Sequence, residues 1–198
     1  MPTKKYCLFF LILLFLLSCC RRKTESVLIV GDSLLCGYKI PEKKSVCSIL
    51  EKKLNKNTVS YCEIGLSASS FSKKLYEYDT HSFSYVIIEL GANDFLLNQS
   101  AQDTRDNLLE IIHFFHKKSV DVYIVSFIDK AMFSLGYNTL LLQQYENMYK
   151  TLQDEAVFVI TNIWNNKFLD AACKADDFHP NETGSKIIAR SIIRHIHD

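Results

Sequence analysis

Continuous apolar runs separated by amphipathic stretches constrain the fold of this chain more than any other feature. We predict five short strands, over residues 26–30, 58–63, 85–89, 120–126 and 157–160. Runs such as Val-Leu-Ile-Val contain no polar residue, which is typical of parallel strands covered on both faces. The pattern therefore predicts a parallel sheet buried between two layers.

The stretches between and after these runs have helical spacing. We predict helices over residues 45–54, 69–78, 103–118, 140–152 and 186–196, of which 69–78 has the weakest period because aromatic and serine residues interrupt it. Strands that alternate with helices of this length imply right-handed crossovers. The predicted fold is an α/β domain with a five-stranded, doubly wound parallel sheet over residues 26–198.

The charge balance excludes one class of function. The chain has 198 residues, with 23 Lys and Arg against 22 Asp and Glu. That length suits one domain. A nucleic-acid-binding protein would carry a basic excess on some element, so we expect no nucleic acid as a partner.

The first residues have the pattern of an export signal. Lys4 and Lys5 precede an apolar run over residues 6–17, which is shorter than the ~20 residues of a membrane-spanning helix. The run ends in Leu16-Leu17-Ser18-Cys19, which resembles a bacterial lipobox, whose cysteine is lipidated. The alternative is an ordinary signal peptide that leaves Cys19 as a plain thiol.

The lipobox interpretation predicts where the protein is found. Residues 1–18 would be the signal peptide, and residues 19–25 the lipid anchor and linker. An extended linker of that length reaches at most ~25 Å. We therefore expect an exported protein of the bacterial cell envelope, held at the membrane by lipid on Cys19.

Four cysteines remain in the predicted domain: Cys36, Cys47, Cys62 and Cys173. Their spacing is not that of a zinc site, in which cysteines come close together in pairs. An oxidising compartment permits disulfides, and four cysteines allow three connectivities. Free thiols and disulfides are both compatible with the sequence.

Four short motifs follow predicted strands. They are Gly31-Asp32-Ser33-Leu34 after the first, Ile64-Gly65-Leu66-Ser67 after the second, Gly91-Ala92-Asn93-Asp94 after the third, and Asp176-Asp177-Phe178-His179-Pro180 at the end of a long polar loop after the fifth. Ligands of open parallel sheets bind beyond the carboxyl ends of the strands. Each motif alone is also explained as a turn or a helix cap, but their joint position favours one shared site.

The residue types in these motifs suit acyl transfer. A serine such as Ser33 becomes a nucleophile when a base takes its proton, and His179 is the candidate base. Asp176, three residues before His179, is the candidate acid that orients the imidazole. The backbone N–H groups of Ser33 and Gly65 and the side-chain amide of Asn93 are candidate donors for an oxyanion hole.

Together the four motifs resemble those of the GDSL hydrolase family, which is also called SGNH after its four key residues. In this sequence those residues correspond to Ser33, Gly65, Asn93 and His179. The resemblance covers residues 27–184. It implies a three-layer α/β/α sandwich of flavodoxin-like topology and hydrolysis of carboxylic esters or thioesters without a metal or other cofactor. Where the family often has glycine after the triad acid, this chain has Asp177. Spacing favours Asp176 as the partner of His179.

The expected function is thus a serine esterase that works through a Ser33 acyl-enzyme and takes a small-molecule or lipid ester. An O-acetyl esterase or acyltransferase acting on carbohydrate is one alternative. A non-catalytic envelope lipoprotein on the same fold is another. Trp164, Asn165 and Asn166, in the long loop before the last motif, are candidate pocket residues.

Overall fold

A computed structural model describes residues 26–79, 82–128, 132–133, 136–155, 157–161 and 173–197. The predicted signal peptide, the predicted anchor at Cys19, and residues 164–166 of the long loop lie outside the described residues. No helix within the described ranges is both long and apolar enough to cross a membrane.

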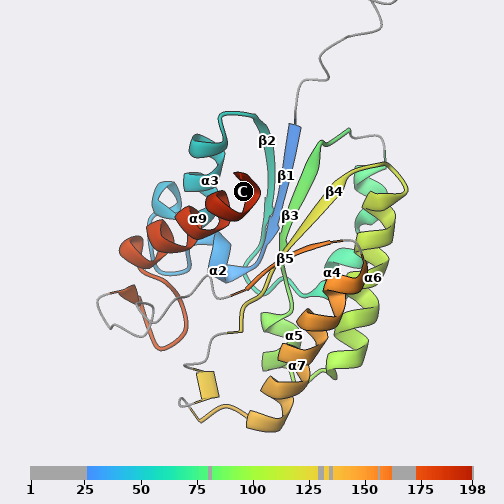
Figure 1. The fold of residues 1–198 in the computed structure, drawn as a ribbon. Helices are drawn as coiled ribbons and strands as arrows, with labels where there is room; N and C mark the ends of the chain where they lie inside the picture. The colour runs from blue at the N-terminus through green and yellow to red at the C-terminus, as the bar shows by residue number, and fades with distance from the viewer. Residues whose placement is uncertain are drawn as a thin grey trace, which may run out of the picture.

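The described chain forms one parallel sheet with helices on both faces (Figure 1). The strands are β1 (Ser26–Gly31), β2 (Asn57–Cys62), β3 (Tyr85–Glu89), β4 (Asp121–Val125) and β5 (Phe158–Ile160). Their order is β2-β1-β3-β4-β5, and every neighbouring pair is parallel. All residues of β1 and β3 are buried, as their unbroken apolar runs predict. The predicted fold, a five-stranded doubly wound parallel sheet, is confirmed.

The helices make two layers (Figure 1). Helices α3 (Val46–Leu54) and α9 (Glu182–His197) pack together on one face, and α4 (Ala68–Ser72), α6 (Ala101–His116) and α7 (Thr139–Leu152) cover the other. Two short helices, α2 (Ser33–Cys36) and α5 (Ala92–Leu96), directly follow β1 and β3. Short 3-10 segments complete the fold: η1 (Glu42–Lys44), η2 (Leu75–Tyr78) and η4 (Gln153–Glu155).

Polar caps set several helix starts that apolar periodicity does not define. The Ser45 side chain accepts from Ser48 N, so α3 begins one residue later than expected. The Asn181 side chain accepts from Thr183 N and Gly184 N, and α9 begins at Glu182, before the apolar period becomes visible. Each cap satisfies backbone N–H groups that lack a partner within the helix.

The prediction of one helix over residues 69–78 is wrong. The structure has α4 there, then η2, with Lys73 and Lys74 between them. Phe71, Leu75 and Tyr78 are all buried in the core. A helix broken into two short pieces brings these three side chains onto the core, which explains why the segment has a blurred helical period.

The connections after β1 and β3 diverge. The chain passes from β1 into α2 and α3 on one face, whereas from β3 it passes into α5 and α6 on the other (Figure 1). Such a switch point leaves a crevice at the carboxyl ends of the two strands, where ligands of doubly wound sheets bind. Ser33 and Asn93 both lie there.

A close approach at Gly184 generates a testable prediction about α9. A Cβ at this position would lie 2.3 Å from the Cys173 carbonyl oxygen and 3.0 Å from the Pro180 side chain. We expect Gly184→Ala to lower the free energy of unfolding by about 1–3 kcal/mol because of this overlap. Elsewhere in a helix, the same change usually stabilises by roughly 1 kcal/mol.

Chemical denaturation of the two proteins measures the effect. Thr183→Ala, at the exposed neighbouring position of α9, is the matched control and should change the unfolding free energy by less than about 0.5 kcal/mol. A Gly184→Ala protein as stable as the parent would contradict the close packing of α9 on the backbone of residue 173.

Candidate active site

Ser33 lies in a tight turn between β1 and α2. Gly31 ends the strand, and a Cβ there would lie 2.6 Å from the side chain of Leu35, so the strand can meet its own helix only with glycine at this position. The carboxylate of Asp32 caps α2 by accepting a hydrogen bond from Leu34 N at 2.9 Å. The turn holds Ser33 with only 7% of its surface exposed.

The turn that carries His179 is built around the carboxylate of Asp176. Its Oδ1 accepts from the backbone N–H groups of Phe178 and His179, at 2.9 and 2.7 Å. The turn is closed by a hydrogen bond from Ala175 N to the His179 carbonyl oxygen and by an antiparallel bridge between Lys174 and Pro180. His179 therefore sits on a short, tightly bonded loop just before α9.

The structure brings three of the predicted site residues together in a line. His179 Nε2 lies 3.0 Å from Ser33 Oγ, and His179 Nδ1 lies 3.0 and 3.1 Å from the two carboxylate oxygens of Asp176. A base within hydrogen-bond reach of a hydroxyl, and itself oriented by an acid, is the arrangement that activates a serine nucleophile. The arrangement is suited to acyl transfer.

The contact of His179 is with Asp176, as spacing favours, whereas Asp177 is exposed. Partial burial opposes ionisation of Asp176, but hydrogen bonds from the backbone of His179 and Phe178 and from the side chains of Lys39 and His179 outweigh it, so the pKa of Asp176 is lowered. These hydrogen bonds therefore favour the charged form of Asp176.

The sequence did not identify two residues that contact Asp176 and His179. The ammonium group of Lys39 lies 3.1 Å from Asp176 Oδ2, and the Tyr38 ring lies against the His179 ring with centroids 4.5 Å apart. Both residues follow Gly37, the left-handed C-cap of α2. No periodicity or motif marks them; their nearness to Ser33 in the chain was the only available signal.

The candidate oxyanion donors divide into two groups. In the described part of the chain, the backbone N–H groups of Ser33 and Gly65 donate to no acceptor and are therefore available. Gly65 has φ of +84° with open space where a Cβ would be, so its requirement for glycine is conformational. The amide nitrogen of Asn93 is already engaged, donating to Asp32 Oδ2 at 2.8 Å and to the Leu66 carbonyl oxygen at 3.1 Å.

Two buried carboxyl groups, those of Asp32 and Glu89, lie at the carboxyl ends of β1 and β3. Burial raises the pKa of Asp32 to about 6, although hydrogen bonds from Leu34 and Asn93 oppose the shift. Glu89, the β3 residue that pairs with Gly31, is completely buried, and burial followed by the charge of Asp32 raises its pKa well above the ordinary value. Burial therefore disfavours the charged form of both carboxyl groups.

Asp94 is a further residue that sequence analysis did not assign to the site. Its Oδ2 accepts from the backbone N–H of Ala68 at 2.9 Å, and its side chain is buried. This bond fastens the start of α4, just beyond the Gly65 turn, to α5. The second and third motifs are thus held together by hydrogen bonds of both Asn93 and Asp94.

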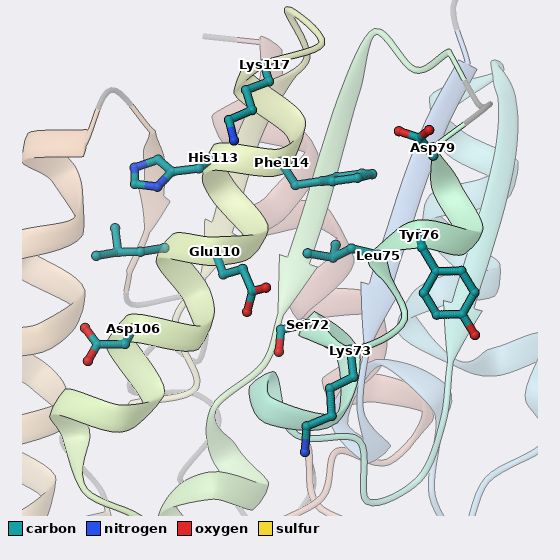
Figure 2. A pocket seen from close by; sticks show the side chains of 11 residues that line it. Ser72, Lys73, Leu75, Tyr76, Asp79, Asp106, Glu110, His113, Phe114 and Lys117 are labelled. Atoms are coloured by element: carbon teal, nitrogen blue, oxygen red, sulfur yellow. The ribbon is translucent and has the colours of Figure 1, made fainter.

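A separate hollow of about 900 Å³ lies between α6 and the α4–η2 segment. Figure 2 shows Phe114 of α6 and Leu75 of η2 projecting into it, with charged side chains around its rim. Its lining does not include Ser33, Gly65, Asn93 or His179. Among the described residues, no group of three or more His, Cys, Asp or Glu side chains is arranged to hold a metal ion.

Comparison with known proteins independently supports a site for acyl transfer. A family model described as GDSL-like Lipase/Acylhydrolase matches residues 27–192. An arylesterase of Vibrio mimicus is 24% identical over 197 residues, covering 94% of this chain and 97% of that protein. The thioesterase 1/protease 1/lysophospholipase L1 of Escherichia coli (strain K12) is 24% identical over 170 residues, with 83% of this chain and 80% of that protein covered.

Solved structures resemble this fold over nearly their whole length. The crystal structure of TesA has a TM-score of 0.78 at 16% identity and covers 87% of this chain and 98% of its own. The psychrotrophic esterase EstA from Pseudoalteromonas sp., solved with monoethylphosphonate as inhibitor, has a TM-score of 0.76 at 16% identity, with 87% and 97% covered. At these identities the likeness establishes the fold.

The two adjacent acids provide a matched test of the site. We expect Asp176→Asn to lower kcat by about 10⁴-fold, because an amide does not stabilise the imidazolium and favours the wrong tautomer of His179. Asp177→Asn, one residue away and exposed, should leave kcat within about twofold. Steady-state hydrolysis of a chromogenic ester measures both. Equal losses of kcat in the two variants would contradict the assignment of Asp176 as the acid that orients His179.

Proposed function

Because the chain belongs to the GDSL-like lipase/acylhydrolase family and is a carboxylic ester hydrolase of that family, we propose that Ser33 is its nucleophile and forms an acyl-enzyme. One observation carries the proposal: the 3.0 Å contact between Ser33 Oγ and His179 Nε2, residues that lie 146 positions apart in the chain. Local turn chemistry does not explain a contact over such a separation.

In the first half of the reaction, Ser33 Oγ attacks the carbonyl carbon of the ester while His179 Nε2 takes the hydroxyl proton. The negative charge of Asp176 stabilises the imidazolium that forms. The imidazolium then passes its proton to the leaving alcohol or thiol as the ester bond breaks. The acyl group remains on Ser33.

In the second half, His179 Nε2 takes a proton from a water molecule, which attacks the acyl-enzyme. Collapse of the second tetrahedral intermediate releases the carboxylic acid and returns the proton to Ser33 Oγ. No redox or metal-dependent step is required for either half. The same base therefore serves twice, held in one orientation by Asp176.

The oxyanion of each tetrahedral intermediate is assigned to the N–H groups of Ser33 and Gly65, which are available as donors. Asn93 joins them by exchanging its hydrogen bond to the Leu66 carbonyl oxygen for one to the oxyanion, while Asp32 keeps the amide in place. The N–H groups of Ser33 and Gly65 need no such exchange, and donors that are fixed before the reaction stabilise developing charge with little reorganisation.

Two exposed apolar residues that lie close in the chain to Gly65 and Asn93 support an ester with an apolar acyl or alcohol part as the substrate. Ile64 precedes Gly65 and is 61% exposed, and Leu97 follows α5 and is 75% exposed. The relatives named above are an arylesterase and a thioesterase/lysophospholipase. We therefore include aryl esters and thioesters among the candidate substrates of this chain.

Replacement of the nucleophile tests the proposal. We expect Ser33→Ala to lower hydrolysis of a short p-nitrophenyl ester by about 10⁴-fold or more, because no hydroxyl remains to form the acyl-enzyme. The parent protein should also be labelled covalently by a fluorophosphonate probe, and Ser33→Ala should not.

Ser82→Ala, at an exposed serine, is the matched control and should keep both activity and labelling. Circular dichroism should show the same helix content in all three proteins. A Ser33→Ala protein that still turned over the ester or reacted with the probe would refute the assignment of Ser33.

We also propose that the hydrolase is exported and tethered to the cell envelope through lipid on Cys19, with residues 1–18 removed as a signal peptide and residues 19–25 as linker. The leader pattern and the lipobox-like sequence support this. The linker joins β1 at Ser26, and Ser33 follows the opposite end of the same strand. The six residues of β1 span roughly 20 Å. The proposed tether therefore joins the domain at the amino-terminal end of β1, and the site lies beyond the carboxyl-terminal end of the same strand.

Adjacent cysteines provide the test of tethering. We expect Cys19→Ser to move the protein from the membrane fraction to the soluble fraction or to leave it unprocessed, and to abolish incorporation of labelled fatty acid. Cys20→Ser should change neither. A protein that still carried fatty acid after Cys19→Ser, or one that lost it after Cys20→Ser, would contradict the choice of Cys19.

A further inference from the structure

Three of the four cysteines of the domain meet at one place in the fold. Cys36 lies at the end of α2, Cys47 lies in the first turn of α3, and Cys62 ends β2. All three line the same hollow of about 740 Å³, together with polar residues of α3 and β2. Three thiols from three separate elements converge there although they lie far apart in the chain.

Cys62 is the central thiol of this cluster. Its side chain neighbours the thiols of both Cys36 and Cys47 in this hollow. Cys36 Sγ also lies 3.7 Å from the Gly31 carbonyl oxygen, and Gly31 is the residue of β1 that pairs with Cys62. Main-chain pairing therefore places Cys36 and Cys62 side by side at the end of the sheet.

A second set of contacts places Cys47 beside the same strand. Cys47 Sγ lies 4.0 Å from Glu51 Oε1, and the same oxygen accepts a hydrogen bond from the Ser60 hydroxyl. Ser60 and Cys62 are two residues apart in β2, so their side chains point to the same face of the sheet. Glu51 thus connects α3 to the face of β2 that carries Cys62.

The electrostatics of the cluster suit thiol–disulfide exchange. The interaction with Cys62 lowers the pKa of the Cys47 thiol, although burial and the negative charges of Glu51 and Glu42 oppose the shift. Hydrogen bonds with Cys36 and Cys47, together with burial, raise the pKa of Cys62. Of these two thiols Cys47 is the one whose pKa is lowered, and a thiolate is the species that attacks a disulfide.

Access and geometry favour oxidation over metal binding. Cys36 and Cys62 are only half-buried and border the hollow, whereas Cys173 is buried and does not line it. In the described ranges no trio of potential ligands, this cluster included, has the arrangement of a metal site. The four cysteines thus separate into a cluster of three and a single buried thiol.

We propose that Cys62 is the shared partner of a disulfide that closes with either Cys36 or Cys47, leaving the third thiol of the cluster free. The oxidant is a second disulfide. One cysteine thiolate attacks it to give a mixed disulfide and release one thiol; the partner thiolate then attacks the mixed disulfide and releases the second thiol. Two cysteine thiols become one disulfide, and the oxidant is reduced to two thiols.

The site is independent of the proposed ester hydrolysis, although it borders the same region. A bond between Cys62 and Cys36 ties α2, which starts at Ser33, to the end of β2, three residues before Gly65. A bond between Cys62 and Cys47 ties α3 to the same strand end. Cys62 takes part in both disulfides, so a change from one disulfide to the other always involves the Cys62 sulfur.

Differential alkylation of the full-length chain tests the proposal. The protein is treated with oxidised glutathione, its free thiols are blocked under denaturing conditions, and the remaining disulfides are reduced and given a second label for peptide mapping. We expect Cys62 to carry the second label in most molecules, with the matching label divided between Cys36 and Cys47. Cys173 should carry the first label throughout and serves as the internal control.

Three variants distinguish the shared partner from random pairing. Cys36→Ser should form the Cys47–Cys62 disulfide, Cys47→Ser should form the Cys36–Cys62 disulfide, and Cys62→Ser should form none within the cluster. A Cys36–Cys47 disulfide in Cys62→Ser, a Cys62 that remains a thiol, or a Cys62 that carries only glutathione would each overturn the proposal. The mapping of the parent protein decides the central claim even if a variant fails to fold.

Discussion

The buried carboxylate of Asp32 joins the elements on which the site depends. It caps α2 through Leu34 N and accepts the amide of Asn93, which in turn donates to the Leu66 carbonyl oxygen. One side chain thus connects the ends of β1 and β3 and, through Asn93, the turn after β2. Removing a carboxylate from water costs several kcal/mol unless hydrogen bonds replace its hydration. Burial raises the pKa of Asp32 to about 6, and these hydrogen bonds oppose the shift.

His179 reaches the same place by a separate route. Its turn is organised by Asp176 and positioned by the start of α9, where Gly184 allows the helix to touch the backbone of Cys173. Ser33 follows a central strand of the sheet, whereas His179 belongs to a loop held by local hydrogen bonds. The contact between Ser33 and His179 is therefore the point at which two independently built parts of the molecule meet.

The acids around the site show how strongly position controls ionisation. Hydrogen bonds from two backbone N–H groups and from Lys39 lower the pKa of Asp176, whereas complete burial and the charge of Asp32 raise the pKa of Glu89. The same type of side chain thus has its charged form favoured in one place and disfavoured in the other.

The amino-acid sequence by itself determined the parallel sheet, the order of its motifs and the choice of Asp176 over Asp177. These follow from local patterns: unbroken apolar runs, polar residues directly after strands, and a three-residue spacing. Only the tertiary structure decided that 69–78 divides into α4 and η2, that Lys39 faces Asp176, and that Asn93 is held by Asp32.

The meeting of Cys36 and Cys47 at Cys62 was equally invisible in the linear chain. Each of these contacts joins residues from different elements, so it depends on strand register and on how closely helices approach the sheet. Periodicity describes which face of an element is buried. It contains no information on which side chain of another element will occupy the space opposite, because that is set by packing across the whole domain.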